Sequence, residues 1–198
     1  GRTITTLAAT GQEHYHELFQ PLTPGFVHAK ANDLPGLIAL AEQNKVAAIM
    51  VEMIQGEGGV NALDRDFVLG LSDYAKKHDI LVIVDEVQTG NGRTGALYAY
   101  QNFGIMPDIV STAKGIGGGL PLGACMLGEK VEFVLGFGDH GSTFGGNPVC
   151  CAGAISTLNR LTEEVLEGVR ERSALIVSTL TGKPGIKSVT GMGLMLGI

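Results

Sequence analysis

The stretch LVIVDEVQTGNGRTG, residues 81–95, contains the strongest indication of the fold. Four apolar and mostly β-branched residues, Leu81 to Val84, predict a strand that is buried on both faces. The strand runs directly into the acidic pair Asp85-Glu86. In open α/β sheets ligands bind beyond the carboxyl ends of the strands, so Asp85 is expected to meet a cofactor or a metal. The alternative is that Asp85 only caps the following turn, and the spacing leaves both interpretations open.

Strands and helices alternate around this stretch. Strands are predicted at 46–51, 81–84 and 108–112, with helices at about 64–78 and 97–103 between them. This alternation predicts a parallel sheet joined by right-handed crossovers. The nine residues AKGIGGGLP that precede the next strand, 122–127, are too few for a parallel crossover. We therefore expect an α/β fold whose sheet is mostly parallel, with one antiparallel strand.

The two ends of the chain carry helix starts and short strands. Asn32-Asp33 followed by Pro35 predicts a helix start near the N-terminus. Asn147-Pro148 is expected to cap one long helix that reaches about Leu180, and short strands are predicted at 186–190 and 193–198. These last elements are expected to belong to a second, incomplete domain.

Composition excludes several classes of partner. The chain has 198 residues, 44% of them hydrophobic and 17% charged, with a net charge of −6. No basic block offsets this acidity, so neither nucleic acid nor an anionic membrane is expected as a partner. No apolar run has the length of a membrane span or of a signal-peptide core, and we expect a cytoplasmic protein. The three cysteines are predicted to be buried thiols, and the histidines show no metal-binding spacing.

Lys114 is the candidate nucleophile. A lone lysine after a strand is usually a solvated surface charge, but Ala113 and the segment GIGGG flank this one. Such small neighbours predict a poorly hydrated amine, and desolvation frees the neutral amine to attack a carbonyl. Together with Asp85 at another strand end, Lys114 indicates an imine-forming cofactor with a positive ring nitrogen, as in pyridoxal phosphate. An acid about 4 Å from that nitrogen contributes roughly 4 kcal/mol at an effective dielectric near 20, which is about three pKa units.

Four motifs resemble those of the class-III, or ornithine-type, aminotransferases, which are fold-type-I pyridoxal-phosphate enzymes. They are VEMIQGEGG (51–59), DEVQTGNGRTG (85–95), PDIVSTAKGIGGGLPLGA (107–124) and HGSTFGGNP (140–148). Within the family they are most similar to the acetylornithine aminotransferases, and the succinylornithine, ornithine and 4-aminobutyrate enzymes share most of these letters. The resemblance implies that residues 1–150 belong to the large cofactor-binding domain. Residues 151–198 would form a connecting helix and the start of a small C-terminal α+β domain.

The resemblance also implies catalytic roles. Lys114 would form the Schiff base with pyridoxal phosphate and then carry a proton between substrate and cofactor. Asp85 would bind the pyridinium nitrogen, Val87 would pack against the ring face, and Gln88 would reach the ring hydroxyl oxygen. The implied reaction moves an amino group between N-acetylornithine, or a similar ω-amino substrate, and 2-oxoglutarate or glutamate in arginine biosynthesis.

Further implied residues concern the phosphate, the substrate and a partner subunit. Ser142 and Thr143 would bind the cofactor phosphate from the neighbouring subunit of a homodimer. Glu57 resembles the gate glutamate that pairs with a substrate-binding arginine. Each residue also has an ordinary alternative: Val87 as core, Gln88 as a turn residue, and Ser142-Thr143 as a plain loop. Arg93 has no role that the sequence indicates.

Parts of the family pattern are not found in these residues. The Ser-Gly-Ala or Ser-Gly-Thr phosphate loop and an aromatic that covers the ring would precede Gly1-Arg2-Thr3, and the substrate arginine is expected beyond Ile198. About half of a family member is therefore expected, with weak cofactor binding and little transaminase activity by this chain alone.

Two other functions compete with this interpretation. A strand ending in Asp-Glu is also typical of nucleotide hydrolases, but no GxxxxGK[ST] loop occurs, and Leu120 breaks a GxGxxG pattern at residues 115–120. The other alternative is a non-catalytic fragment that folds and associates.

Overall fold

The computed structural model describes residues 2–198, so Gly1 of the predicted motif lies outside the described part. The chain forms two compact units that divide after Lys45. The first unit contains α1 (Ile4–Ala9), the 3-10 helix η1 (Glu13–Tyr15) and α2 (Leu34–Asn44). The predicted start of α2 is confirmed. The Asp33 carboxylate accepts a hydrogen bond from the Gly36 N–H at 3.1 Å, and a proline lies in the first turn.

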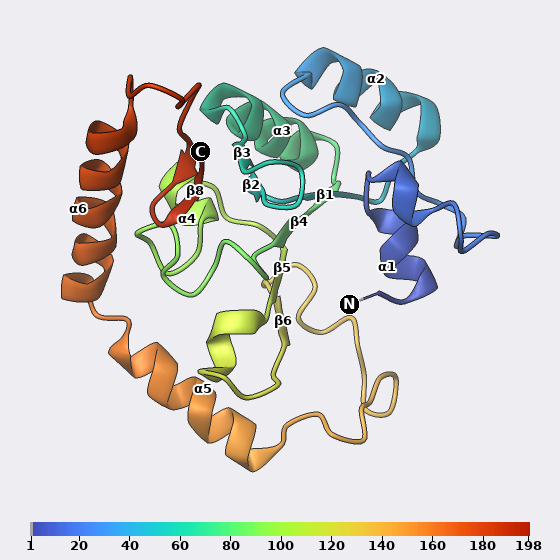
Figure 1. Ribbon diagram of the computed structural model, residues 1–198. Coiled ribbons are helices and arrows are strands. Elements are labelled where there is room, and N and C mark those ends of the chain that lie inside the picture. Colours follow the sequence, from blue (N-terminus) through green and yellow to red (C-terminus); the bar gives the residue numbers. More distant parts are fainter. Residues whose placement is uncertain (1) are drawn as a thin grey trace. The chain divides into compact units, whose positions relative to one another are not determined.

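The second unit is built on a four-stranded sheet with the order β1-β4-β5-β6 (Figure 1). The strands β1 (Ala48–Val51), β4 (Leu81–Asp85) and β5 (Ile109–Thr112) run parallel. The helices α3 (Arg65–Lys77) and α4 (Tyr100–Phe103) lie between them in sequence. Strand β6 (Ala124–Leu127) pairs antiparallel with β5. The expected mostly parallel sheet with one antiparallel strand is confirmed.

Strand β4 is buried on one face only. Val82 and Val84 are buried, whereas the alternate residues Leu81, Ile83 and Asp85 are half-buried. The buried face lies in the core with one side of α3, which contributes Phe67, Val68, Leu71 and Ala75. The prediction of a strand buried on both faces is therefore wrong. An apolar run does not show whether both faces of a sheet are covered, because burial depends on the elements that pack on each face.

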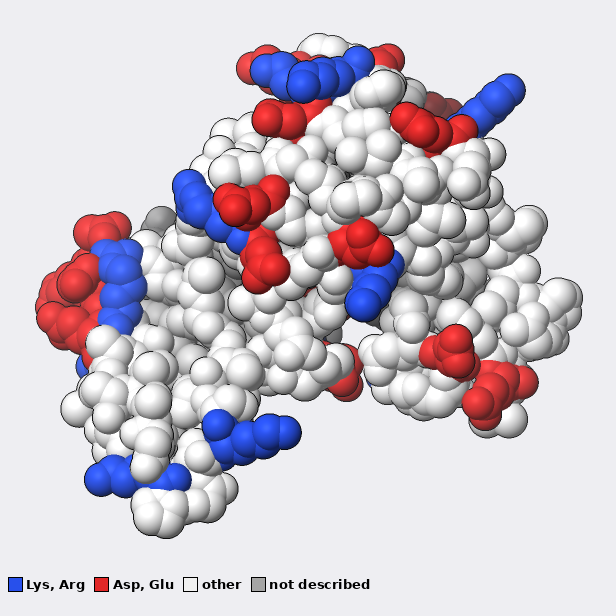
Figure 2. Space-filling view, turned by 90° about the horizontal axis from the view of Figure 1, so that it is seen from above, with Lys and Arg blue, Asp and Glu red and all other residues white. Residues whose placement is uncertain are grey.

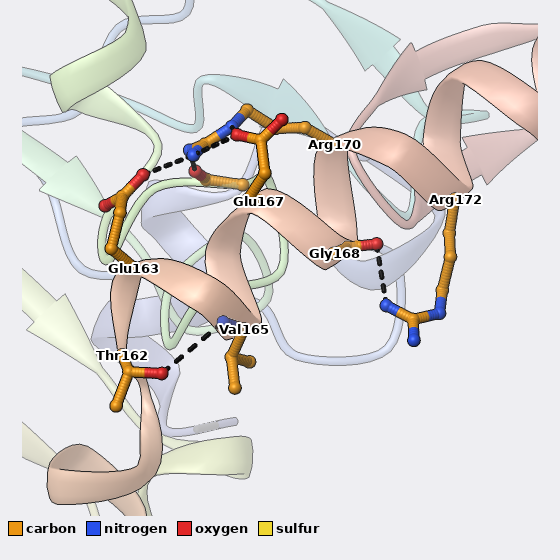
Figure 3. A network of polar contacts seen from close by, with 8 residues as sticks. Thr162, Glu163, Val165, Glu167, Gly168, Arg170 and Arg172 are labelled. Carbon is orange, nitrogen blue, oxygen red and sulfur yellow. Dashed lines mark hydrogen bonds and ion pairs between the residues drawn. The ribbon is translucent and has the colours of Figure 1, made fainter.

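The predicted long C-terminal helix is two helices, α5 (Pro148–Arg160) and α6 (Glu163–Leu180). Asn147 caps α5 as predicted, accepting hydrogen bonds from the backbone N–H groups of Val149 and Cys150. The chain then leaves helical geometry at Leu161, and the Thr162 hydroxyl accepts from the Val165 N–H to begin α6 (Figures 1 and 3). A threonine followed by two glutamates is a helix start, and this local capping overrides the continuous apolar stripe.

Arg170 connects α6 to the loop that follows β4. Figure 3 shows its guanidinium between Glu163 and Glu167, with which it forms ion pairs. Its Nη1 also donates to the backbone carbonyl of Gly95 at 2.5 Å. Exposed ion pairs stabilise a protein little, but the contact with Gly95 fixes where α6 meets the 90–95 loop.

Two small hairpins complete the unit. Strand β2 (Ile54–Gln55) pairs with β3 (Asn61–Ala62), and β7 (Thr190–Met192) pairs with β8 (Met195–Gly197). The strand predicted at 186–190 is wrong except at Thr190, because β7 begins only there, and β8 is shorter than the predicted 193–198. The β7–β8 turn packs on the loop after β4, where the Leu194 N–H donates to the Arg93 carbonyl at 2.9 Å. Gly193 in this turn has φ +59°, and a Cβ there would lie 2.5 Å from the Cα of Thr94.

The surface carries scattered charges. On the face shown in Figure 2, basic side chains do not form a continuous surface. Among the helices of the described chain, none combines the length and the apolar character that crossing a membrane requires.

Of the three cysteines, Cys150 is buried, Cys151 is half-buried and Cys125 is exposed, so the prediction of buried thiols is right for Cys150 alone. The predicted domain boundary at residue 150 remains a prediction.

The close contact at Gly193 is tested with Gly193→Ala. The new methyl group would collide with backbone and would also occupy a left-handed conformation, so we expect a loss of about 2 to 4 kcal/mol in the free energy of unfolding. Gly182→Ala is the matched control, because Gly182 has φ +76° and no atom within 4 Å of its Cβ position. The control should lose only about 1 kcal/mol in urea denaturation. Equal losses in the two variants would show that the contact with Thr94 is unimportant.

Candidate active site

Lys114 stands in a constrained turn directly after β5. It begins the 3-10 helix η2 (Lys114–Gly117) with φ +46°, a left-handed conformation that is uncommon for residues other than glycine. Its side chain is exposed, so the expectation of a poorly hydrated amine is wrong for this chain. Small flanking residues bring the backbone close, but they do not cover a side chain that extends beyond them. The turn nevertheless holds the amine at the carboxyl edge of the sheet.

Asp85 ends β4 at the same edge. Its backbone pairs in register with Ser111 of β5, three residues before Lys114. The Oδ1 atom accepts a hydrogen bond from the Val87 N–H at 2.9 Å, so Asp85 does cap the following turn. Oδ2 makes no hydrogen bond within residues 2–198, so it has no partner that a ligand would need to displace. The two interpretations of Asp85 from sequence are therefore compatible, because each concerns a different oxygen.

Glu52, which follows β1, connects these two groups electrostatically. Burial raises the pKa of its carboxyl group above the usual 4.5, while the Gly56 N–H that donates to Oε2 at 3.2 Å opposes the rise. The negative charge of Asp85 raises the Glu52 pKa further, and the positive charge of Lys114 lowers it. Glu52 therefore lies within electrostatic range of both Asp85 and Lys114. Three consecutive strands of the parallel sheet end in this one group of charges.

A cavity of about 390 Å³ lies beside the lysine. Four segments line it: the loop after β4, the η2 turn, the β7–β8 hairpin and the end of the 56–60 loop. The lining residues are Val60, Val87, Gln88, Gly90, Asn91, Arg93, Lys114, Gly115 and residues 194–196. No carboxylate is among these lining residues, whereas two cations are. The cavity therefore favours an anionic or electron-rich ligand.

The predicted site residues divide into two groups. Val87 and Gln88 line the cavity with Lys114. Gln88 also lies against Gly56, where a Cβ would come within 2.3 Å of the Gln88 Oε1 atom. Glu57, by contrast, is exposed in the 56–60 loop outside this lining, and so are Ser142 and Thr143 in the segment before α5. Asp85 is not among the lining residues either, so the described chain does not bring these four residues to the cavity.

Several residues that shape the site carry no signal in the sequence. Val60 and residues 194–196 come from distant parts of the chain, and no local pattern indicates that they meet. Asn91 contacts the residues just before Lys114 through two side-chain hydrogen bonds. Among residues 2–198, no group of three side chains is arranged to hold a metal ion.

Glu86 has a structural role that strand alternation could have indicated. Because Asp85 points to the half-buried face, its neighbour must point to the core, and Glu86 is fully buried. Its Oε2 atom accepts from the Thr89 hydroxyl at 2.5 Å, and Oε1 accepts from the Tyr100 N–H at 2.9 Å. Burial raises the pKa of this carboxyl group, and these hydrogen bonds oppose the rise. Glu86 thereby connects the start of α4 to the loop that carries Val87 and Gln88.

Comparison with known proteins agrees with this architecture. The family model described as aminotransferase class-III matches residues 1–198. The chain belongs to the class-III aminotransferase family. It is 49% identical to the acetylornithine aminotransferase of Haemophilus ducreyi and 46% identical to that of Aquifex aeolicus, each over the whole chain. It covers 50% and 52% of those proteins, so this class-III chain spans about half the length of the curated relatives it matches.

Solved structures of the family have the same fold. The ornithine aminotransferase of Toxoplasma gondii superposes with a TM-score of 0.91 at 37% identity, over 98% of this chain and 48% of that one. The N-acetylornithine aminotransferase of Stenotrophomonas maltophilia superposes with a TM-score of 0.77 at 35% identity, over 88% of this chain and 46% of that one. The expected family and fold are confirmed, and enzymes of this family depend on pyridoxal phosphate.

Replacing Glu86 tests the buried carboxylate beside the site. Since its pKa is raised in the folded chain, the unfolded chain ionises first as the pH rises above 4.5. Stability is therefore lost as the pH rises through the folded-state pKa. Glu86→Gln removes this titration. The free energy of unfolding of the variant minus that of the parent should therefore increase as the pH rises from 4.5 to the folded-state pKa, by about 1.4 kcal/mol per unit by which folding raises the pKa.

The measurement is urea denaturation of both proteins between pH 4 and pH 8. Glu171→Gln, at an exposed position of α6, is the control and should run parallel to the parent at every pH. If the difference in free energy of unfolding between Glu86→Gln and the parent does not change with pH, folding does not raise the pKa of Glu86.

Proposed function

We propose that this chain carries the lysine-bearing part of the active site of a pyridoxal-phosphate-dependent transaminase of the acetylornithine type. The proposed reaction moves an amino group between N-acetylornithine, or a similar ω-amino substrate, and 2-oxoglutarate or glutamate, in arginine biosynthesis. One observation carries the proposal. Asp85 ends β4 and Lys114 follows the adjacent parallel strand β5, and the charges of both act on Glu52, which follows β1 on the other side of β4.

The chemistry of these residues fits the ring of pyridoxal phosphate. An exposed amine is available for the carbonyl carbon, and Oδ2 of Asp85 is available for the ring nitrogen. Val87 offers a branched apolar surface and Gln88 offers amide groups at the cavity that Lys114 lines, while Asp85 ends the neighbouring strand outside this lining. The fit to the phosphate is incomplete, because Ser142 and Thr143 do not line the cavity of the described chain.

Each residue has a defined task in this proposal. When bound, pyridoxal phosphate supplies an electron sink that stabilises negative charge on the substrate carbon. Lys114 Nζ would hold the cofactor covalently and then move a proton to or from that carbon. Asp85 Oδ2 would keep the ring nitrogen protonated, because a carboxylate at about 4 Å favours the charged form. Val87 would orient the ring and exclude water from its face.

The remaining part of the site is proposed to come from a second copy of the chain. The segment that carries Ser142 and Thr143 is rich in exposed apolar side chains, namely Phe133, Val134, Leu135, Phe137, Phe144 and Val149. Exposed apolar residues in such number are typical of an interaction surface. A homodimer that buries this segment could bring Ser142 and Thr143 to the partner's cofactor. Glu57, in its exposed loop, is proposed to gate a substrate carboxylate site.

The proposal is tested by adding pyridoxal phosphate to the purified chain. We expect a yellow absorbance band that borohydride fixes to the peptide containing Lys114, as detected by mass spectrometry. Lys114→Ala should abolish the band, and Asp85→Asn should weaken binding about tenfold, because the ring nitrogen loses its counter-charge. Lys130→Ala is the control, since Lys130 pairs with Asp79 on the surface and does not line the cavity.

Transaminase activity of this chain alone should remain low, because the phosphate contacts are incomplete within it. ATP binding without a yellow band would favour a nucleotide hydrolase. Absence of both would favour a non-catalytic fragment, and robust turnover by the 198-residue chain would contradict the expected need for further residues.

A further inference from the structure

Asn91 connects the loop after β4 to the end of β5. Its side-chain Nδ2 donates to the Thr112 hydroxyl at 3.1 Å and to the Ala113 carbonyl at 3.2 Å. Thr112 is buried, and it is the last residue of β5. The two hydrogen bonds therefore cross from one strand end to the next, immediately before Lys114.

The same side chain lies along the lysine-bearing turn. The Ala113 carbonyl that accepts from Asn91 also accepts from the Ile116 N–H at 3.2 Å, which closes the first turn of η2. On the other side of Lys114, a Cβ built on Gly115 would lie 3.6 Å from the Cβ of Asn91. Asn91 therefore contacts the chain on both sides of Lys114, and both residues line the same cavity.

The backbone of Lys114 needs such support. A lysine at φ +46° is strained, and strained conformations persist only where the surroundings determine them. Asn91 itself has φ +57°, which asparagine tolerates better than most residues. A simple turn-forming role would explain its backbone conformation, but it would not explain the two side-chain hydrogen bonds.

The other end of the amide argues against a role in stability alone. Asn91 Oδ1 is buried and has no hydrogen-bond partner within the described residues. An unpaired buried carbonyl is unfavourable, so the Asn91 side chain lowers stability at this atom. Its presence is therefore explained by what its Nδ2 group does, which is to hold Thr112 and Ala113 beside Lys114.

We propose that Asn91 is a positioning residue for Lys114. Its amide donors fix the Ala113 carbonyl, and the fixed turn directs the lysine amine toward the cavity. The task of that amine rests on the proposed function, but the positioning itself concerns only residues of this chain. It can therefore be measured without cofactor.

Two variants separate the side chain from the backbone. Asn91→Gly keeps the left-handed conformation accessible and removes both hydrogen bonds. Asn91→Asp keeps the shape but replaces the two donors with a carboxylate beside Lys114. Asn102→Asp is the matched control, because Asn102 Nδ2 also donates to a threonine hydroxyl, that of Thr94, at 3.1 Å, and Asn102 does not line the cavity.

Two readouts are taken on the cofactor-free chain. Hydrogen exchange measures the amides of Ile116 and Gly118, which bond to the carbonyls of Ala113 and Gly115. The rate of Lys114 acetylation at a fixed pH, followed by mass spectrometry, measures how the turn presents the amine. Both Asn91 variants should speed exchange in this turn about tenfold and change the acetylation rate of Lys114 by more than about twofold. Asn102→Asp should leave both the exchange in this turn and the acetylation rate within about twofold of the parent.

The proposal is overturned if both Asn91 variants match the parent in both readouts. It is also overturned if exchange rises equally across the whole chain in both variants while the acetylation rate of Lys114 stays at the parent value, since Asn91 would then serve folding in general. A parent chain that gives no yellow band with pyridoxal phosphate would contradict the proposed function. That result would leave the exchange and acetylation tests of Asn91 intact.

Discussion

The parallel pairing of β4 with β5 is the constraint on which the site depends. The register that places Asp85 opposite Ser111 also places the chain after Thr112 beside the chain after Asp85. A shift by one residue would turn Asp85 toward the core and Glu86 toward the ligand, because strand side chains alternate. The sheet therefore decides which of two adjacent acids is buried and hydrogen-bonded and which remains available.

Backbone strain is concentrated around the cavity. Three of the six described non-glycine residues with positive φ, namely Val60, Asn91 and Lys114, line the same cavity. Such conformations cost about 1 to 3 kcal/mol each, so their surroundings must hold them. The contacts of Asn91 with Thr112 and Ala113 are one such restraint. The packing of Gly191 and Gly197 close to Val60 is another. The rest of the unit thus supports a locally unfavourable loop geometry.

The sequence predicted those features that depend on local pattern. The strand directions were predicted from the apolar runs and from the nine-residue link before β6. The starts of α2 and α5 were predicted from the Asp33 and Asn147 caps. The break at Thr162 and the half-covered face of β4 were missed, because a capping residue can interrupt an apolar stripe and burial depends on distant elements. The exposure of Lys114 and the convergence of Val60 with residues 194–196 are tertiary features that spacing cannot reveal.

A crystal structure of this chain soaked with pyridoxal phosphate would test most directly whether Lys114 and Asp85 serve one ligand. We expect continuous density from Lys114 Nζ into a ring that packs on Val87, with the ring nitrogen within hydrogen-bond distance of Asp85 Oδ2. Density that leaves Asp85 without contact, or a ring bound at another lysine, would contradict the assignment of these two strand ends to a single site.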